Sequence, residues 1–394
     1  MKRASAPSLL VGLALVAVQI ASPDLAAAQS NQPSSEPATV ALSEAQQPDV
    51  AAALQALLDD QVQKQAIPGM IMAVRLPDGT VVVRSAGSVD PAGALAWTPD
   101  TASPLGSVTK TFTAVVVMQL VEEGKLTLDD TIDTWFPDQP NANTITVRML
   151  LSHTSGLGNA ILPTNQRDPK WAGEWAPLDF VAEANRNDPP VEPGTDVARY
   201  SNAGYFLLGL IVEAVTGNSW EHEIRSRINE PLSLTTAAFA SDEGVWGQII
   251  EGYFKMPDGY LSSLDVPNYP HASTAWAAGG VVSSVTDLLT FASALFDGAL
   301  VSEETLAEMS TPLARDRESG RLWGLGGATL ESLPGGFGMG GDVPGYHAFF
   351  LGLSGTKLVV AALVNCEEGD VIGPSLMAFD YLRALPPATG LPAQ

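Results

Sequence analysis

Two pairs of strand-like runs, one near each end of the 394-residue chain, most constrain its fold. GMIMAVRL and TVVVRSAG are joined by a Pro-Asp-Gly turn at 77–79, while HAFFLGL and KLVVAALVN are joined by a Ser-Gly-Thr turn at 354–356. Apolar runs of this length, bounded by turn-forming residues, predict two hairpins. The simplest way to bury both is one antiparallel sheet built from the two ends of the chain.

Helical spacing of apolar residues indicates what surrounds this sheet. Patterns at 50–66 and at about 374–385 predict terminal helices that cover it. Together with the middle of the chain they predict an α+β fold: an antiparallel sheet flanked by the terminal helices, plus a mostly helical lobe of about residues 105–300 inserted between the sheet-forming ends. A stretch rich in Pro, Asn and Trp at 158–196 is interpreted as a loop. The helices expected in the lobe cover 108–123, 147–152, 204–216, 220–228 and 286–296.

The N-terminus has the pattern of a secretory signal peptide at 1–28, with two basic residues, an apolar run at 9–20 and three alanines at 26–28. We expect a disordered leader at 29–48, one large folded domain at 49–388 and a tail at 389–394 to follow. The apolar run is shorter than the about 20 residues that span a bilayer, and no cysteine lies near the cleavage site. We therefore expect an exported protein, periplasmic or secreted, without a membrane anchor.

Composition excludes several kinds of partner. The formal charge of −24 disfavours nucleic acid and anionic membrane surfaces. The single cysteine, Cys366, ends an apolar run, which is typical of a small buried residue. The four histidines are far apart and lack the paired spacings of metal sites, so we expect neither metal nor cofactor.

The stretch LGSVTKTFTA places Ser107 three residues before Lys110, where an apolar helical pattern begins. Residues at i and i+3 share a helix face, so the amine can reach the hydroxyl. A serine is a weak nucleophile until a base takes its proton, and a lysine kept neutral by burial can be that base. An ordinary helix cap with a solvated lysine would show the same spacing. The second copy of the pattern, Ser354 with Lys357, falls in the turn at 354–356 and is interpreted as turn residues.

Two further stretches carry candidate site residues. In ARYSNAGYFLLG, Ser201 or Asn202 could cap the helix while Tyr200 packs, or the Tyr200 phenol could relay a proton while Asn202 orients Lys110 and a substrate carbonyl. In GMGGDVPGYHAFFLGL, glycines before a strand would let a substrate approach and let a backbone N–H complete an oxyanion hole.

In order and spacing, these stretches resemble the serine hydrolases of the class C β-lactamase and D-alanyl-D-alanine carboxypeptidase type, which include esterases and small-peptide hydrolases. The resemblance covers about residues 50–385 and implies an antiparallel sheet flanked by helices plus a helical lobe. It implies that His153 is packed rather than catalytic. The motifs that carry it are GSVTKTFTA, LLSHTSGL, RYSNAGYFLLG, AAGGVVSS and GGDVPGY.

The resemblance also implies roles for the candidate residues. Ser107 would be acylated, with Lys110 as its base and Tyr200 as the proton relay. Asn202 matches the asparagine of the family's second box. The backbone N–H of Asp342 would join that of Ser107 in binding the oxyanion.

The third box departs from the family pattern. Relatives often begin it with Lys or His, whereas this chain has Met339, Gly340 and Gly341. Methionine can neither bind a substrate carboxylate nor lower the pKa of the lysine base. β-Lactamase and strict carboxypeptidase activity are therefore disfavoured, unless an arginine such as Arg199 or Arg321 supplies the charge. We expect Asn202 and the residues at 339–342 to bind substrate.

The sequence thus predicts an exported serine hydrolase that cleaves amide bonds of small peptides through an acyl-enzyme on Ser107. Alternatives within the resemblance are an esterase, a β-lactamase and a catalytically impaired penicillin-binding protein. An α/β-hydrolase would need a Gly-x-Ser-x-Gly elbow, which the sequence lacks. The substrate would be a small peptide, amide or ester; oligomeric state is left open.

Overall fold

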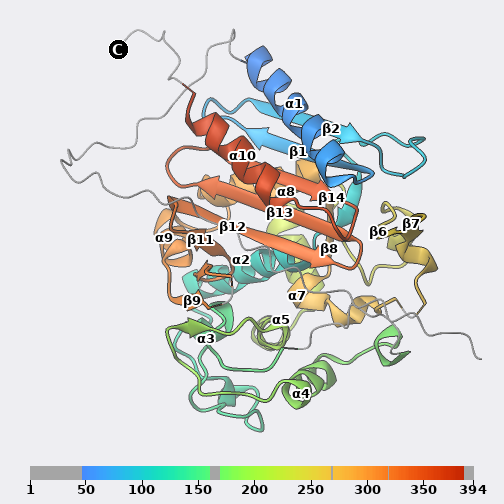
Figure 1. Cartoon of the computed structure of the whole chain (residues 1–394). Helices are drawn as coiled ribbons and strands as arrows, with labels where there is room; N and C mark the ends of the chain where they lie inside the picture. The colour runs from blue at the N-terminus through green and yellow to red at the C-terminus, as the bar shows by residue number, and fades with distance from the viewer. Residues whose placement is uncertain (1–46, 160–168, 268, 318, 386–394) are drawn as a thin grey trace, which may run out of the picture. The chain divides into compact units, whose positions relative to one another are not determined.

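A computed structural model describes residues 47–159, 169–267, 269–317 and 319–385 (Figure 1). Within these ranges the main sheet has nine strands in the order β2-β1-β14-β13-β12-β11-β10-β9-β4. All neighbours run antiparallel except β4 and β9, which are parallel. The strands are β1 Gly69–Arg75, β2 Val81–Gly87, β4 Val197–Ala198, β9 Ala314–Asp316, β10 Leu322–Trp323, β11 Ala328–Leu330, β12 Leu333–Val343, β13 Tyr346–Leu353 and β14 Val359–Val364.

The two ends of the chain meet in this sheet, which confirms the pairing expected from the sequence. β1 lies against β14, with Met70 opposite Val364 and Arg75 opposite Val359. Both strands are buried along their whole length. Figure 1 shows why: α1 (Gln47–Gln65) and α10 (Ile372–Arg383) cover one face of the sheet, while α8 (Val285–Phe296) packs on the other. Strands covered on both faces have continuous apolar sequences, as these do.

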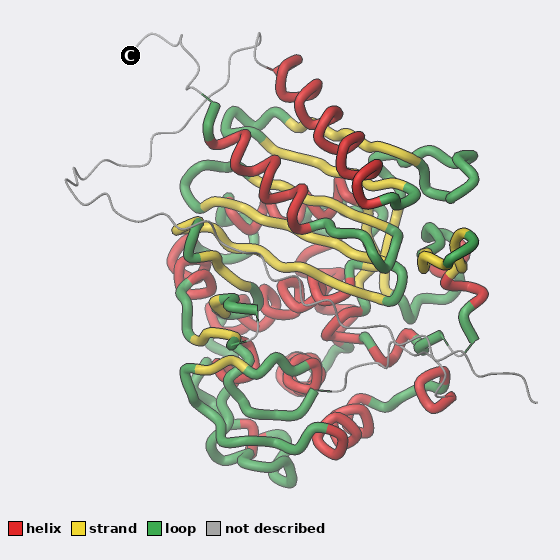
Figure 2. The backbone as a smooth tube through the Cα atoms, in the orientation of Figure 1, coloured by secondary structure: helices red, strands yellow, loops and turns green. Residues whose placement is uncertain are grey.

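Helices and loops make up most of the chain between the outer hairpins (Figure 2). This arrangement confirms the predicted α+β class with its helical lobe. The remaining helices are α2 Thr109–Glu122, α3 Val147–Leu151, α4 Pro177–Asn187, α5 Asn202–Thr216, α6 Trp220–Ile224, α7 Trp276–Gly279 and α9 Glu303–Ser310. Two small sheets comprise β3 Ala102–Pro104 with β8 Val281–Ser284 and β5 Ala238–Phe239, and β6 Tyr253–Met256 with β7 Gly259–Ser262.

Two local predictions were wrong, and a third differs in helix type. The stretch at 158–196 contains α4, which begins at Pro177 and buries Phe180 and Val181, so its loop-like composition concealed an amphipathic helix. The glycine-rich third box lies inside β12 rather than before a strand, because close neighbours leave no room for side chains there. The helix expected over 220–228 is present, as α6 followed directly by a π-helical turn, Arg225–Asn229.

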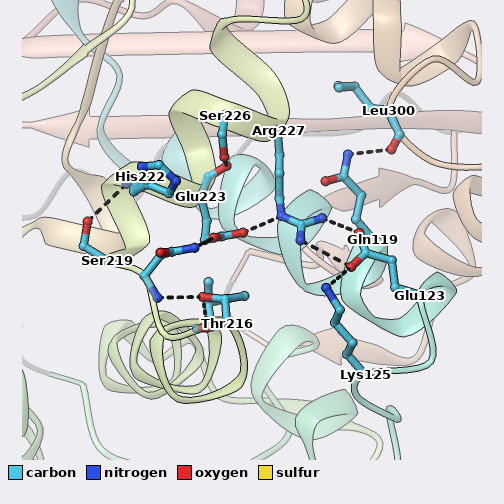
Figure 3. Close-up of polar contacts among 12 residues, drawn as sticks. Gln119, Glu123, Lys125, Thr216, Ser219, His222, Glu223, Ser226, Arg227 and Leu300 are labelled. Atoms are coloured by element: carbon cyan, nitrogen blue, oxygen red, sulfur yellow. Dashed lines mark hydrogen bonds and ion pairs between the residues drawn. The ribbon is translucent and has the colours of Figure 1, made fainter.

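A charged network ties the C-terminal end of α2 to the segment after α6 (Figure 3). The Arg227 guanidinium donates to Glu223 Oε2 and to Glu123 Oε1, both at 2.5 Å, and Lys125 Nζ lies 2.8 Å from Glu123 Oε2. The hydrogen bond from Arg227 is the largest of the effects that lower the pKa of Glu123 to about 2. The Glu223 side chain is only 5% exposed and also accepts from Asn218 Nδ2. These bonds fix the helix that carries Lys110 at its other end.

The predicted signal peptide (1–28) and tail (389–394) lie outside the described residues, as does the leader (29–48) up to residue 46. No helix in the described ranges is long and apolar enough to cross a membrane. Cys366 is fully buried, which confirms the expectation for it.

Candidate active site

Ser107 and Lys110 lie on either side of a change in helix type. A 3₁₀ turn, Gly106–Val108, leads into α2, so the helix begins one residue later than the sequence suggested. Residues three apart are nearly aligned in a 3₁₀ turn, which places Lys110 beside Ser107. Lys110 Nζ lies 3.0 Å from Ser107 Oγ. The sequence spacing therefore predicted the right contact through a different local geometry.

Lys110 is fully buried among uncharged partners. Its Nζ donates to Asn202 Oδ1 and to the Ala278 carbonyl, each at 2.7 Å. Burial lowers the pKa of Lys110 well below its usual value, although the charge of Asp342 opposes the shift. A neutral amine has two N–H groups and one lone pair. The two oxygens take the N–H groups, and the lone pair is left for the hydroxyl of Ser107.

Tyr200 is the second side chain that contacts the Ser107 hydroxyl. Its OH donates to Ser107 Oγ at 2.6 Å. Burial raises the pKa of Tyr200, so the side chain is a phenol at neutral pH. Ser201 caps α5 by accepting from Gly204 N, which leaves Tyr200 and Asn202 on either side of the cap free to face the amine and hydroxyl. The capping interpretation of Ser201 is confirmed, whereas the roles of Tyr200 and Asn202 in catalysis stay predictions.

His153 packs behind Tyr200. It is 1% exposed, with ring-centroid distances of 4.4 Å to Tyr200 and 4.6 Å to Trp323. Its Nδ1 accepts from the backbone N–H of Ser201, and burial lowers its pKa, so the ring is neutral. The expectation of a packed histidine is confirmed, and its contacts restrict the orientation of the Tyr200 ring.

The residues of the third box face different ways. A Cβ on Gly341 would lie 1.9 Å from the Leu105 carbonyl oxygen and 2.7 Å from Ser107 N, so only glycine lets β12 lie against the 3₁₀ turn. Gly340 is directed toward α10, where a Cβ would lie 3.4 Å from Ile372 Cδ1. The box thus brings backbone, rather than side chains, up to Ser107.

Met339 is 4% exposed and packs in the core. It also lines a cavity with Arg321 and Trp323, which Ser107 does not border. The two arginines named as replacement cations differ in position. Arg199 is paired with Asp188 and donates to backbone carbonyls, whereas the charge of Arg321 reaches Tyr200 and Asp342 and acts to lower the pKa of both.

Sequence reasoning missed two groups at the site. The Ala278 carbonyl that binds Lys110 belongs to AAGGVVSS, but a backbone acceptor leaves no side-chain signal in the sequence. His347 lies opposite Asp342 in the β12–β13 ladder, with Nδ1 2.5 Å from Asp342 Oδ1 and Nε2 2.7 Å from the Glu367 carbonyl oxygen. Burial disfavours the imidazolium, yet Asp342 and Glu367 raise the pKa of His347 to about 9.

Comparison with known proteins decides the family. The β-lactamase family model matches residues 54–378, most of the chain. The chain belongs to this family. It is therefore a serine hydrolase of the kind that the sequence motifs suggested, and both the fold class and the enzymatic nature predicted above are confirmed.

Three relatives illustrate the range of this family. Penicillin-binding protein 4 of Amycolatopsis lactamdurans is 30% identical over 76% of this chain and 81% of its own length. D-amino acid amidase from Ochrobactrum anthropi SV3, in complex with L-phenylalanine amide, superposes with a TM-score of 0.75 at 28% identity, over 85% of this chain and all of that chain. An octameric penicillin-binding protein homologue from Pyrococcus abyssi gives a TM-score of 0.72 at 28% identity, covering 86% and 79%.

Within the described residues, no group of three or more His, Cys, Asp or Glu side chains is arranged to hold a metal ion. The expectation that the enzyme uses neither metal nor cofactor stays a prediction.

Proposed function

We propose that this protein hydrolyses amide bonds of small amino acid or peptide substrates through an acyl-enzyme on Ser107. The observation that carries the proposal is the position of Lys110: a fully buried amine whose partners are two uncharged oxygens and the Ser107 hydroxyl. A buried ammonium without a carboxylate partner is costly, so the amine stays neutral and can accept a proton.

The oxyanion hole would consist of the backbone N–H groups of Ser107 and Asp342. Pro344 and Gly345 form a two-residue turn, so Val343 and Tyr346 are a hydrogen-bonded pair, and the Asp342 N–H points away from β13. A Cβ on Gly106 would lie 2.7 Å from Asp342 N, which shows how closely this edge of β12 approaches the turn that carries Ser107. Two convergent N–H groups suit the negative oxygen of a tetrahedral intermediate.

In acylation, Ser107 Oγ forms a bond to the substrate carbonyl carbon while its proton passes to Lys110 Nζ. The amide nitrogen then leaves with its electron pair and takes a proton through the Tyr200 hydroxyl, which Lys110 resupplies. The leaving amine departs and an ester to Ser107 remains. In deacylation, water attacks this ester, its proton returns along the same route, and Ser107 regains its hydroxyl hydrogen as the carboxylic acid product leaves.

Amides are ranked above esters because the site offers a proton to the leaving group, which a poor leaving group such as an amine needs. The similarity to the Ochrobactrum D-amino acid amidase supports the same ranking. A β-lactamase or carboxypeptidase that binds a substrate carboxylate at the start of the third box is disfavoured, because Met339 there is uncharged and buried. Export to the periplasm or medium remains part of the proposal, and it rests on the N-terminal sequence pattern.

The test is intact-protein mass spectrometry combined with turnover on amino acid amides, short peptides, simple esters and a cephalosporin. We expect Ser107→Ala to lose at least about 10⁴-fold in kcat/KM and to form no adduct. Ser354→Ala, which alters the other Ser-x-x-Lys copy, is the matched control and should behave as wild type. Covalent labelling of Ser107 without turnover of any substrate would instead identify the impaired penicillin-binding protein.

A further inference from the structure

His153 lies at a backbone position that a glycine would fill without strain. It directly follows Ser152, the C-cap of α3, and its φ is +60°. The N–H of Thr154 donates to the Met149 carbonyl at 2.9 Å, which closes the helix in the way typical of a glycine at this place. A side chain at a positive φ costs free energy, although histidine tolerates it better than most residues. The imidazole at this position therefore points to a use that a glycine could not serve.

His153 binds the backbone on both sides of Tyr200. The N–H of Arg199 donates to the His153 carbonyl at 2.8 Å, and the N–H of Ser201 donates to His153 Nδ1 at 3.2 Å. The imidazole also lies against the Tyr200 ring, with a centroid distance of 4.4 Å. His153 therefore holds Tyr200 directly at its ring and indirectly through both of its neighbours in the chain.

Only one form of the imidazole can make these contacts. Burial lowers the pKa of His153 well below its usual value, so the ring is neutral. Because Nδ1 accepts a hydrogen bond, the ring proton lies on Nε2. Nε2 is buried without a hydrogen-bond partner among the described residues, and the Trp323 ring lies edge-to-face at 4.6 Å. The one acceptor atom of the ring is thus occupied by the Ser201 N–H.

These contacts act on the Tyr200 hydroxyl in particular. That hydroxyl lies at the far end of a long side chain and donates to Ser107 Oγ at 2.6 Å, so a small rotation of the Tyr200 backbone moves it out of reach. Asn202 is held separately, because its N–H donates to Asn159 Oδ1 at 3.1 Å. Loss of the His153 contacts should therefore displace the phenol more than the amide that binds Lys110.

We propose that His153 is a positioning residue that aligns the Tyr200 hydroxyl with Ser107 Oγ, and that its acceptor atom Nδ1 is the part of the side chain on which this alignment depends. The inference rests on the proposed function, since it takes Tyr200 as the proton relay. His153 exchanges no proton with the substrate and acts only through Tyr200. Displacement of a catalytic group by about 1 Å can lower a rate on the order of 10²-fold.

The experiment compares His153→Asn with His153→Leu on the amide that wild type turns over fastest in the panel that tests the proposed function. The two side chains share one branched shape, but only asparagine presents an acceptor where His153 has Nδ1. We expect His153→Asn to keep kcat within about threefold of wild type, and His153→Leu to lose at least about tenfold in kcat with KM little changed. His222→Leu, at an exposed histidine, is the matched control and should behave as wild type. An equal loss of kcat in His153→Asn and His153→Leu would overturn the inference.

A double-mutant cycle separates alignment of Tyr200 from a general loss of structure. In the Tyr200→Phe background there is no hydroxyl to align, so His153→Leu should lower kcat by less than about threefold more. A tenfold loss that persists in that background would refute this inference alone. Should His153→Leu fail to fold, His153→Gly replaces it in the cycle, because glycine suits a positive φ and also lacks the acceptor. A Tyr200→Phe enzyme with unchanged kcat would instead refute the relay in the proposed function.

Discussion

A basic side chain lies at each end of α2, and both are largely buried. Their partners differ in charge. At the C-terminal end, Arg227 is bound by the carboxylates of Glu123 and Glu223 (Figure 3). At the N-terminal end, Lys110 is bound by an amide oxygen, a carbonyl and a hydroxyl. Carboxylate partners fix the charge and make the group structural, whereas neutral partners favour loss of the proton and make the group a base.

The largest expected effect is on catalysis at the N-terminal end. Lys110→Met removes the base, and we expect kcat/KM on an amide substrate to fall by about 10⁴-fold. Lys357→Met, in the other Ser-x-x-Lys copy, is the matched control and should leave kcat/KM unchanged. Steady-state kinetics of both variants measures this loss. A kcat/KM of Lys110→Met within about tenfold of wild type would contradict the role of Lys110 as the base.

At the C-terminal end of α2, a substitution should change the stability of the fold instead of catalysis. Arg227→Met leaves Glu223, which is 5% exposed, without its charged partner, and we expect the free energy of unfolding to fall by about 3 kcal/mol. Arg315→Met breaks an exposed pair with Glu331 and should cost less than about 1 kcal/mol. Urea denaturation measures both variants. Equal losses would show that the buried network contributes no more than a surface ion pair.

Tyr200→Phe tests whether the phenol relays a proton at the N-terminal end of α2. The variant keeps the ring that packs on His153 but loses the hydroxyl that donates to Ser107 Oγ. We expect kcat to fall by about 10²-fold with KM little changed, because the proton relay acts in the chemical steps. A rise in KM at constant kcat would assign the phenol to substrate binding and contradict the relay.

The smallest effects are pH dependences of stability, which have the same sign at the two ends of α2 but fall in separate pH ranges. The folded-state pKa of Lys110 is lowered, so between that pKa and 10.5 the unfolded chain binds a proton that the folded chain lacks, and the free energy of unfolding rises with pH. The stability of wild type relative to Lys110→Met should therefore improve as the pH approaches 10.5. Differential denaturation from pH 7 to 10 measures this, and a constant difference would mean that Lys110 is already charged in the fold.

At the other end, the pKa of Glu123 is lowered to about 2, so its contribution is present above 4.5 and is lost as the pH falls toward 2. The stability advantage of wild type over Arg227→Met should shrink in this acidic window. Denaturation curves between pH 3 and 6 measure it, and an advantage that persisted unchanged at pH 3 would remove Glu123 as the cause.

The sequence predicted those features that depend on local pattern. Continuous apolar runs predicted β1 and β14, and the spacing of Ser107 and Lys110 predicted their contact. It did not predict β12, because glycine has low strand propensity and is required here by the close approach to the 3₁₀ turn. Nor did it predict the Ala278 carbonyl or the pairing of Asp342 with His347, since both depend on which strands and loops meet in three dimensions.

The central claim is that Lys110 carries no charge in the working enzyme, and its own titration tests this most directly. Protein labelled with ¹³C at lysine Cε would be titrated by NMR, and the Lys110 resonance identified as the one missing from Lys110→Met. The account predicts that this resonance titrates well below 10.5. A Lys110 resonance that titrated near 10.5 would contradict it.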